Sequence, residues 1–339
     1  MTQSPFYYQR YTEAEAAKME KKLRKVYEEA GKEIEEKTAD YWERHRKRAM
    51  KHWQEVQEGK LSLADYQAWM QGQVYQGKAW QERKEQVANV LYNSNVAAQR
   101  MISGELSNIF IFNANYMAYE MEHGEGLDLG FQMMDSAAVT RLLRDDPHIL
   151  PSKKLVKGKD VRWNFQNIRN ELTKGLIIGE SIDQLTTRIT KQVPNRNWNQ
   201  MRTHARTAYG NAMNGARFER IKELNRRGVE THKQWLAILD ERTRWMHRDL
   251  DMKTAKEDEP FEIGQYSIMY PHDPFAAPAM VYNCRCSLRY FNPKYPDNWE
   301  RRDNIDGEII GDMTYNEWAE AKGIRNTRPQ GMKPVSRTR

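Results

Sequence analysis

The chain has little cysteine and no long apolar run. Only two of its 339 residues are cysteine, so a disulfide framework is excluded and nothing requires an oxidising compartment. No apolar stretch approaches the roughly 20 residues that cross a bilayer, and the opening MTQSPFYYQR lacks the pattern of a secretory signal. We therefore expect a protein made in the cytoplasm and kept there, or inside a particle assembled there, with no membrane partner.

Apolar residues are sparse for a compact globule. Hydrophobic residues make up 39% and charged residues 30% of the chain, a balance that favours extended helices with much solvated surface. The net charge of +7 is concentrated in a C-terminal tail without acidic residues. Such a tail would bind the phosphates of DNA by charge alone, or serve only as a solubilising end. Its basic residues are Lys322, Arg325, Arg328, Lys333, Arg337 and Arg339.

Residues 1–125 have the period of amphipathic helices. Small and apolar side chains recur there at steps of three and four, with Lys and Glu on the other faces. Gly59 ends a first helix, and Ser62 is placed to cap a second, which we predict over 63–104, with a further apolar segment at 106–121. The sequence therefore predicts a long helical arm, folded as an antiparallel hairpin or a small bundle.

Four tryptophans fall at helical spacing in this arm. Trp42 and Trp53, like Trp69 and Trp80, are eleven residues apart, which is about three helical turns, so each pair shares one face. We predict a helix-packing seam in preference to a surface for a partner helix or an aromatic binding ladder.

The middle of the chain is predicted to connect two folded parts. Residues 126–159 contain several glycines and prolines, a short predicted helix at 136–144, and four lysines that read as a solvated linker rather than a nucleic-acid contact. Three helices are predicted after it, over 164–175, 181–192 and 197–227.

A β-containing segment follows these helices. Alternating apolar residues predict a strand over 234–239, after which Asp240 is predicted to cap a short helix. Turn-forming residues then lead to a second strand-like run that begins at Asn283. We predict a mainly α fold with a small α+β module at 160–291, followed by an extended tail at 292–339 with a small helix at 315–322.

Both cysteines lie in that second run. Cys284 and Cys286 are two positions apart, so on a strand both sulfurs point to one face, and a disulfide between them would be strained. With His247 and His272 they form a candidate Cys₂His₂ zinc site. The alternative is a pair of reduced, half-buried thiols on a strand, with His272 capping a turn.

Asp240, Arg242 and His247 resemble the acid, anion clamp and base of a metal-dependent hydrolase or nuclease. No second carboxylate pair, glycine-rich phosphate loop or nucleophile elbow accompanies them. We therefore prefer a structural interpretation, in which Asp240 caps the helix, Arg242 and Arg244 pair with acids such as Asp249, and His247 is hydrogen-bonded in a small core.

These motifs together resemble the head-morphogenesis (Mu F-like) family of minor head proteins from tailed bacteriophages. The resemblance covers roughly residues 160–291, with Ala208 at a position where many members have an acidic residue. It is carried by Trp163-Asn164, the run 175–182, His204-Ala205-Arg206-Thr207, Asn214-Gly215-Ala216, Asp240-x-Arg242-Thr243-Arg244-x-x-His247, Pro260-Phe261, Pro271-His272-Asp273-Pro274 and Asn283-Cys284-Arg285-Cys286.

The resemblance implies a structural protein inside the capsid head, near the portal vertex, that acts in head morphogenesis and in DNA packaging or ejection. It implies the portal, the major capsid and scaffold proteins, and packaged DNA as partners. In this interpretation the arm, around 16–34 and 69–91, docks on a protein partner and the tail faces DNA. Asp240, Arg242, Thr243 and Asn283 are then residues of a structural motif.

The alternative from another class is an enzyme, either a metal-dependent hydrolase or nuclease, or a toxin-associated module that uses Asp240, Arg242 and His247. Only about 45 residues follow Phe291, which is too few for an appended catalytic domain. We therefore expect a protein that is not an enzyme.

Overall fold

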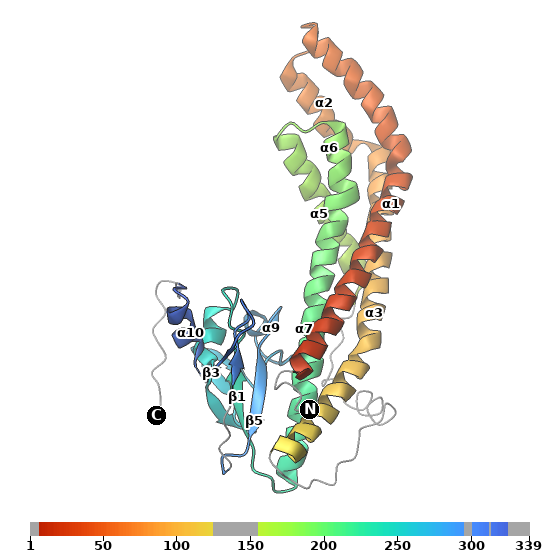
Figure 1. The fold of residues 1–339 in the computed structure, drawn as a ribbon. Coiled ribbons are helices and arrows are strands. Elements are labelled where there is room, and N and C mark those ends of the chain that lie inside the picture. Colours follow the sequence, from red (N-terminus) through yellow and green to blue (C-terminus); the bar gives the residue numbers. More distant parts are fainter. Residues whose placement is uncertain (1–6, 125–154, 295–299, 312, 325–339) are drawn as a thin grey trace. The chain divides into compact units, whose positions relative to one another are not determined.

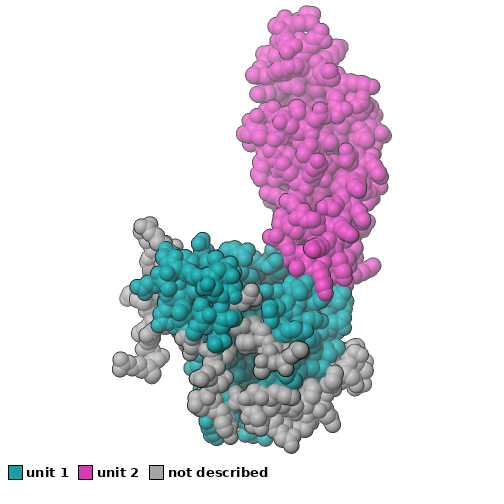
Figure 2. Space-filling model, in the orientation of Figure 1, with its two compact units in different colours: residues 1–16, 103–152, 203–339 teal, residues 17–102, 153–202 magenta. Residues whose placement is uncertain are grey.

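The chain forms two compact units, which are coloured separately in Figure 2. The computed structural model describes residues 7–124, 155–294, 300–311 and 313–324. We call residues 1–16, 103–152 and 203–339 the sheet unit, and residues 17–102 and 153–202 the helical unit. Each unit therefore takes residues from both the predicted arm and the predicted module, because three long helices contribute to both.

Most of the described chain is helical, as the sequence predicts (Figure 1). Among the described helices, none combines the length and the apolar character needed to cross a membrane. The helix predicted at 136–144 lies outside the described residues. The helices are α1 (Tyr7–Gln57), α2 (Leu63–Gln76), α3 (Lys78–Gly124), α5 (Lys157–Ile177), α6 (Ile182–Thr187), the π-helix η1 (Arg188–Gln192), α7 (Val193–Arg226), α8 (Trp245–Leu250), α9 (Pro278–Val281) and α10 (Tyr315–Ala321).

The start of α2 follows the prediction, but its end does not. Gly59 has a positive φ of 72° just after α1, and the Ser62 side chain caps α2 by accepting a backbone N–H. The predicted helix over 63–104 is interrupted at Gly77, which is extended. By contrast, α3 runs without a stop through residues 103–104 to its end. A glycine inside a helix costs only about 1 kcal/mol, which tertiary packing offsets.

The predicted linker and the first helix after it also differ from the prediction. α5 begins at Lys157, so residues 157–159 are helical rather than part of a linker. Lys153 and Lys154 lie outside the described residues. The predicted linker therefore ends before residue 157, and α5 includes the helix predicted at 164–175.

The helices predicted at 181–192 and 197–227 are one uninterrupted run from α6 through η1 to α7. Pro194 lies in the first turn of α7 and has no N–H to bond to the carbonyl of Thr190, four residues earlier. The π-helix η1, which contains Thr190, accommodates the proline at this point. The same carbonyl faces α1 at Gly31, where an added Cβ would lie 2.5 Å from the oxygen. The two helices approach closely because residue 31 has no side chain.

Aromatic side chains fill much of the core of the helical unit. Trp42 and Trp80 are 3% and 1% exposed, and their ring centroids are 5.2 Å apart. Trp69 stacks on His45 nearby, with centroids 5.6 Å apart. The predicted packing seam is confirmed for Trp42 and Trp80, whereas Trp53 is largely exposed.

The run 175–182, from the end of α5 to the start of α6, has a structural role. An added Cβ at Gly175 would lie 2.5 Å from a carboxylate oxygen of Glu180 and 2.5 Å from a methyl carbon of Leu185, so a side chain at this position would displace both groups. Glu180 forms a salt bridge with Arg188, which also bonds to Glu171 at 3.0 Å. Ser181 begins α6 with a capping box, as its position in the sequence predicts.

The sheet unit contains a small antiparallel sheet of strand order β2–β1–β5 (Figure 1). Trp235 on β1 pairs with Leu288 on β5, and both pack in one core with Ile221 and Leu224 from the end of α7. The predicted small α+β module is thus present. The strands are β1 (His232–Leu236), β2 (Thr254–Lys256), β3 (Phe261–Ile263), β4 (Tyr266–Ile268), β5 (Ser287–Phe291), β6 (Arg301–Arg302) and β7 (Ile309–Ile310).

The segment after β5, predicted to be extended apart from a helix at 315–322, is folded where it is described. β6 and β7 pair, and α10 forms at the position of the predicted helix. Tyr315 and Trp318 are 0% and 1% exposed and pack against Leu239. Burial of two large aromatic side chains keeps this segment on the sheet unit. Residues 325–339 lie outside the described residues.

Candidate functional site

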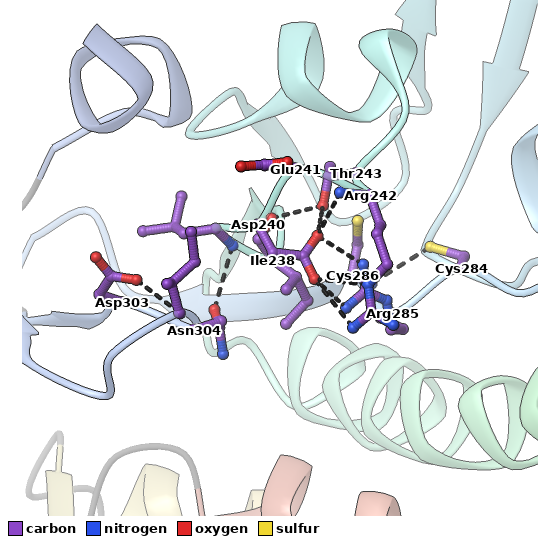
Figure 3. Close-up of polar contacts among 12 residues, drawn as sticks. Ile238, Asp240, Glu241, Arg242, Thr243, Cys284, Arg285, Cys286, Asp303 and Asn304 are labelled. Carbon is purple, nitrogen blue, oxygen red and sulfur yellow. Dashed lines mark hydrogen bonds and ion pairs between the residues drawn. The ribbon is translucent and has the colours of Figure 1, made fainter. Parts of the chain in front are cut away.

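The motif residues meet where the chain leaves β1 and enters β5. Leu236 pairs with Ser287, so the loop after β1 and the segment before β5 lie side by side (Figure 3). The strand predicted at 234–239 ends earlier than expected. Cys284 and Cys286 precede β5 instead of lying on it. Their sulfurs nevertheless converge, because this short segment is fixed by side chains from other elements.

Asp240 and Arg285 form a two-pronged ion pair at this point (Figure 3). Nη1 of Arg285 lies 2.5 Å from one carboxylate oxygen of Asp240, and Nη2 lies 2.8 Å from the other. Burial by itself raises the pKa of Asp240, but the hydrogen bonds and charge of Arg285 outweigh it, so the pKa lies below its ordinary value. Asp240 is therefore an ionised, fully engaged carboxylate rather than a free acid.

Asp240 does not cap a helix, contrary to the prediction. It organises a turn, because its Oδ1 accepts the backbone N–H of Arg242 at 3.0 Å and lies 3.2 Å from the Thr243 hydroxyl. That hydroxyl donates to the carbonyl of Ile238 at 2.6 Å. α8 begins only after the turn, and Arg244 at its N-cap makes no side-chain capping bond. The Asp240 carboxylate is thus bonded within the turn at residues 240–243 and is not bonded to the first turn of α8.

Of the two motif arginines predicted to pair with acids, Arg242 does so and Arg244 bonds instead to backbone carbonyls. Arg242 is largely exposed and its guanidinium contacts Asp240 at 3.3 Å, two residues away. Arg244 donates to the carbonyl of Tyr282 at 2.8 Å and so fastens α8 to the segment before β5. Neither of these two contacts is to Asp249.

His247, Cys284 and Cys286 form one buried cluster. Nδ1 of His247 lies 3.3 Å from each sulfur, and the three residues are 2%, 5% and 2% exposed. Burial raises the pKa of Cys286. Burial also acts to raise the pKa of Cys284, but hydrogen bonds from the thiol and backbone N–H of Cys286 lower it below the usual value. Nitrogen and sulfur donors in this arrangement can hold a metal ion.

His272, predicted as the fourth zinc ligand, lies outside this cluster. Its Nε2 donates to the carbonyl oxygen of Cys284 at 2.7 Å, and its Nδ1 lies 3.2 Å from the amide nitrogen of Asn214. Burial lowers the pKa of His272 to about 4, so the ring is neutral. The ring packs against Gly210 of α7, where any Cβ would overlap it. The side chain of His272 therefore positions the cysteine segment by bonding to the backbone carbonyl of Cys284.

Asn283 has a backbone role that explains its place in the motif. Its φ is 54°, a conformation that asparagine adopts more readily than most residues. Its backbone N–H donates to the hydroxyl of Thr207 on α7 at 3.0 Å. The helix motif around residue 204 and the Asn-Cys-Arg-Cys motif are thus joined by a direct bond.

Asp251 and Tyr315 complete the site and were missed by sequence reasoning. The Asp251 carboxylate accepts the backbone N–H of Ala237 at 2.8 Å and that of Tyr315 at 2.6 Å. The Tyr315 hydroxyl donates to the carbonyl of Asp240 at 2.8 Å. No local pattern indicates these bonds, since the partners come from distant parts of the chain.

Lys322, predicted as the first DNA-binding residue of the tail, is engaged in the fold. Its ammonium lies 2.9 Å from the Asp303 carboxylate and also pairs with Asp306. Asp303 accepts the indole N–H of Trp318 at 2.8 Å as well. Lys322 therefore has a structural role, and its contact with DNA stays a prediction. The other five basic residues of the tail lie outside the described residues.

Comparisons with known proteins agree with the motifs. Residues 166–289 match the family described as Phage Mu protein F like protein. Over 227 residues the chain is 28% identical to the minor head protein GP7 of Bacillus phage SPP1, which covers 66% of this chain and 72% of GP7. No solved structure matches this chain significantly.

A second relative is the NAD(+)--arginine ADP-ribosyltransferase EFV of Enterococcus faecalis (strain ATCC 700802 / V583). The two are 30% identical over 168 residues, which is 49% of this chain. The chain spans only 33% of the length of that transferase. The ion pair of Asp240, the cluster of His247 and the cysteine segment all lie inside the residues that match the family. Residues 166–289 of this chain therefore form a module that matches the Phage Mu protein F like family.

Proposed function

We propose that this chain is a minor head protein of a tailed bacteriophage and acts in head morphogenesis. The observation that carries the proposal is the extent of the similarity to the minor head protein GP7, which runs through 72% of that protein. It is not limited to the family module, because it also covers 66% of this chain.

The arrangement of the motif favours a structural role over catalysis. Asp240 is held by Arg285 and by its own turn, and His247 is buried with its Nδ1 on two sulfurs. A general acid or base needs a proton-transfer position open to a substrate. The similarity to the transferase spans a third of that protein, so we do not assign its activity to this chain.

The finer proposal places the protein inside the head, near the portal vertex, with the portal, major capsid or scaffold proteins as partners. We propose the helical unit as the docking part, and its exposed large apolar side chains as the first candidates for contact with a partner. These are Met50, Trp53, Leu63, Val156, Ile177 and Ile178. A role in DNA packaging or ejection is part of the same proposal.

Quantitative mass spectrometry of purified procapsids and filled heads, from the phage or prophage that encodes this chain, tests the proposal. We expect the protein in both particles, at a copy number comparable with that of the portal protein. Cross-links to the portal or scaffold are expected to begin in the helical unit. Absence from particles, together with abundance in infected cells, would contradict a head protein and return attention to Asp240 and His247 as an active site.

DNA binding by the tail is a separate expectation. The basic residues after residue 324 are to be changed to glutamine, and we expect binding of duplex DNA at low salt to weaken by about tenfold or more, since each phosphate contact releases a counterion. Fluorescence anisotropy measures this at two salt concentrations. The residues to change are Arg325, Arg328, Lys333, Arg337 and Arg339.

The matched control removes the same number of positive charges from the exposed face of α1. If both variants lose DNA binding equally, the attraction belongs to the net charge of the protein and not to the tail. The control residues are Lys21, Lys25, Lys32, Lys47 and Lys51.

A further inference from the structure

We propose that His247, Cys284 and Cys286 hold a zinc ion. The imidazole nitrogen and the two sulfurs lie within 4.8 Å of one another, and all three residues are buried. Imidazole nitrogen and cysteine sulfur are the donors that Zn²⁺ takes most often in proteins. The residues come from two segments, α8 and the approach to β5, so the ion would join them. This site does not depend on the proposed head-protein function.

The contacts of His247 favour a metal over hydrogen bonds alone. Its Nδ1 lies 3.3 Å from the sulfur of Cys284 and 3.3 Å from that of Cys286. A ring nitrogen has a single in-plane position, for a proton or a lone pair, so it serves only one of two sulfurs well. A zinc ion about 2.1 Å from the nitrogen and about 2.3 Å from each sulfur satisfies all three atoms, at a nitrogen–sulfur separation of about 3.5 Å.

The surroundings hold the two cysteines in place before any ion binds. The backbone N–H of Cys286 lies 3.3 Å from the sulfur of Cys284, and such a donor favours the thiolate that a metal requires. The carbonyl of Cys284 accepts Nε2–H of His272, and the carbonyl of Cys286 accepts the Asn214 amide at 3.3 Å. Arg285, between the cysteines, is fixed by its ion pair. Outer contacts of this kind orient metal ligands.

Arg244 lies beside His247 on the side away from the sulfurs. A metal on Nδ1 leaves the ring proton of His247 on Nε2, so the Arg244 guanidinium, which lies 3.3 Å from Nε2, has to turn away from it, because both groups would then be donors. Arg244 remains anchored by its bond to the Tyr282 carbonyl at 2.8 Å. Within the described part of the chain, no fourth His, Cys, Asp or Glu joins the group. One position of a tetrahedron is therefore left for water or another exogenous ligand.

The test uses untagged full-length protein, purified under reducing conditions without chelator from cells grown with zinc. Elemental analysis is expected to find about one zinc ion per chain. The double variant Cys284→Ser/Cys286→Ser is expected to retain less than roughly a tenth of it. The control His232→Ala removes a partly exposed histidine from the same sheet and is expected to keep the full zinc content.

A second measurement needs no variant and so is unaffected by misfolding. Cobalt(II) titrated into the metal-free wild-type protein is expected to give sulfur-to-cobalt charge-transfer absorption that saturates at about one equivalent and is reversed by zinc. Absence of this absorption in reduced, folded protein overturns the proposal. Zinc retained in full by the double cysteine variant also overturns it, because the metal would then be held elsewhere.

Discussion

Replacing Asp240 with alanine is expected to lower the free energy of unfolding of the sheet unit by about 3 kcal/mol. Asp240 is 8% exposed and bonds to Arg285 at 2.5 and 2.8 Å. Its removal leaves the Arg285 guanidinium partly buried without a carboxylate, and the turn loses its bond to the N–H of Arg242. Chemical denaturation followed by near-ultraviolet circular dichroism measures the change.

The exposed Asp258 provides the matched control, since Asp258→Ala removes a carboxylate of the same unit and is expected to change stability by less than about 0.5 kcal/mol. The double variant D240A/R285A is expected to lose less than the sum of the two single losses, because it leaves no unpaired charge. If D240A keeps full stability but abolishes a measurable hydrolase activity, the catalytic alternative is correct.

The same ion pair predicts a direction for the pH dependence. The pKa of Asp240 is lower in the folded chain than its ordinary value of 3.8. The stabilisation from this group is therefore fully present above pH 3.8 and is lost as the pH falls through the lower folded value. In D240A this part of the acid sensitivity is expected to be absent.

Replacing Gly210 with alanine is expected to cost about 2–3 kcal/mol, although alanine favours helices. An added Cβ would lie closer than 3.0 Å to three atoms of the His272 ring. That ring cannot move freely, since it is bonded to the Cys284 carbonyl and to Asn214. Thermal and chemical denaturation of the full chain measure the loss.

Gly215, on the same helix, is a closely matched control. A Cβ there meets nothing nearer than the Tyr270 hydroxyl at 3.6 Å, so G215A is expected to be neutral or slightly stabilising. The double variant G210A/H272A is expected to lose less than the sum of the two single losses, because without the ring the added Cβ overlaps nothing. Equal effects of G210A and G215A would show that the close approach of His272 is not what requires glycine.

The helical part of the fold was largely predictable from the sequence. Steps of three and four residues, the cap at Ser62 and the capping box at Ser181 all act within one or two helical turns. The sequence did not predict that the helices on the two sides of Pro194 form one continuous run. It does not show that α1 packs at Gly31 against the carbonyl of Thr190, in the π-helix just before this proline.

The candidate site was predictable as a set of residues but not as a set of contacts. The motif pointed to Asp240, His247 and both cysteines, and the structure brings the last three together. It did not indicate that Arg285 would form an ion pair with Asp240. It also did not indicate that His272 would bond to a backbone carbonyl instead of joining the sulfurs.

The sequence by itself determined the mainly helical character, the small β-containing module and the similarity to the phage family. These features depend on periodicity, on caps and on short motifs, which are set by neighbours in the chain. Only the tertiary structure decided which polar groups pair. The pairing of Leu236 with Ser287 places the Asp240 turn beside Arg285, and the packing of Trp318 places Lys322 on Asp303. Such contacts join distant residues, and their partners are chosen by strand register and core packing, neither of which a local pattern contains.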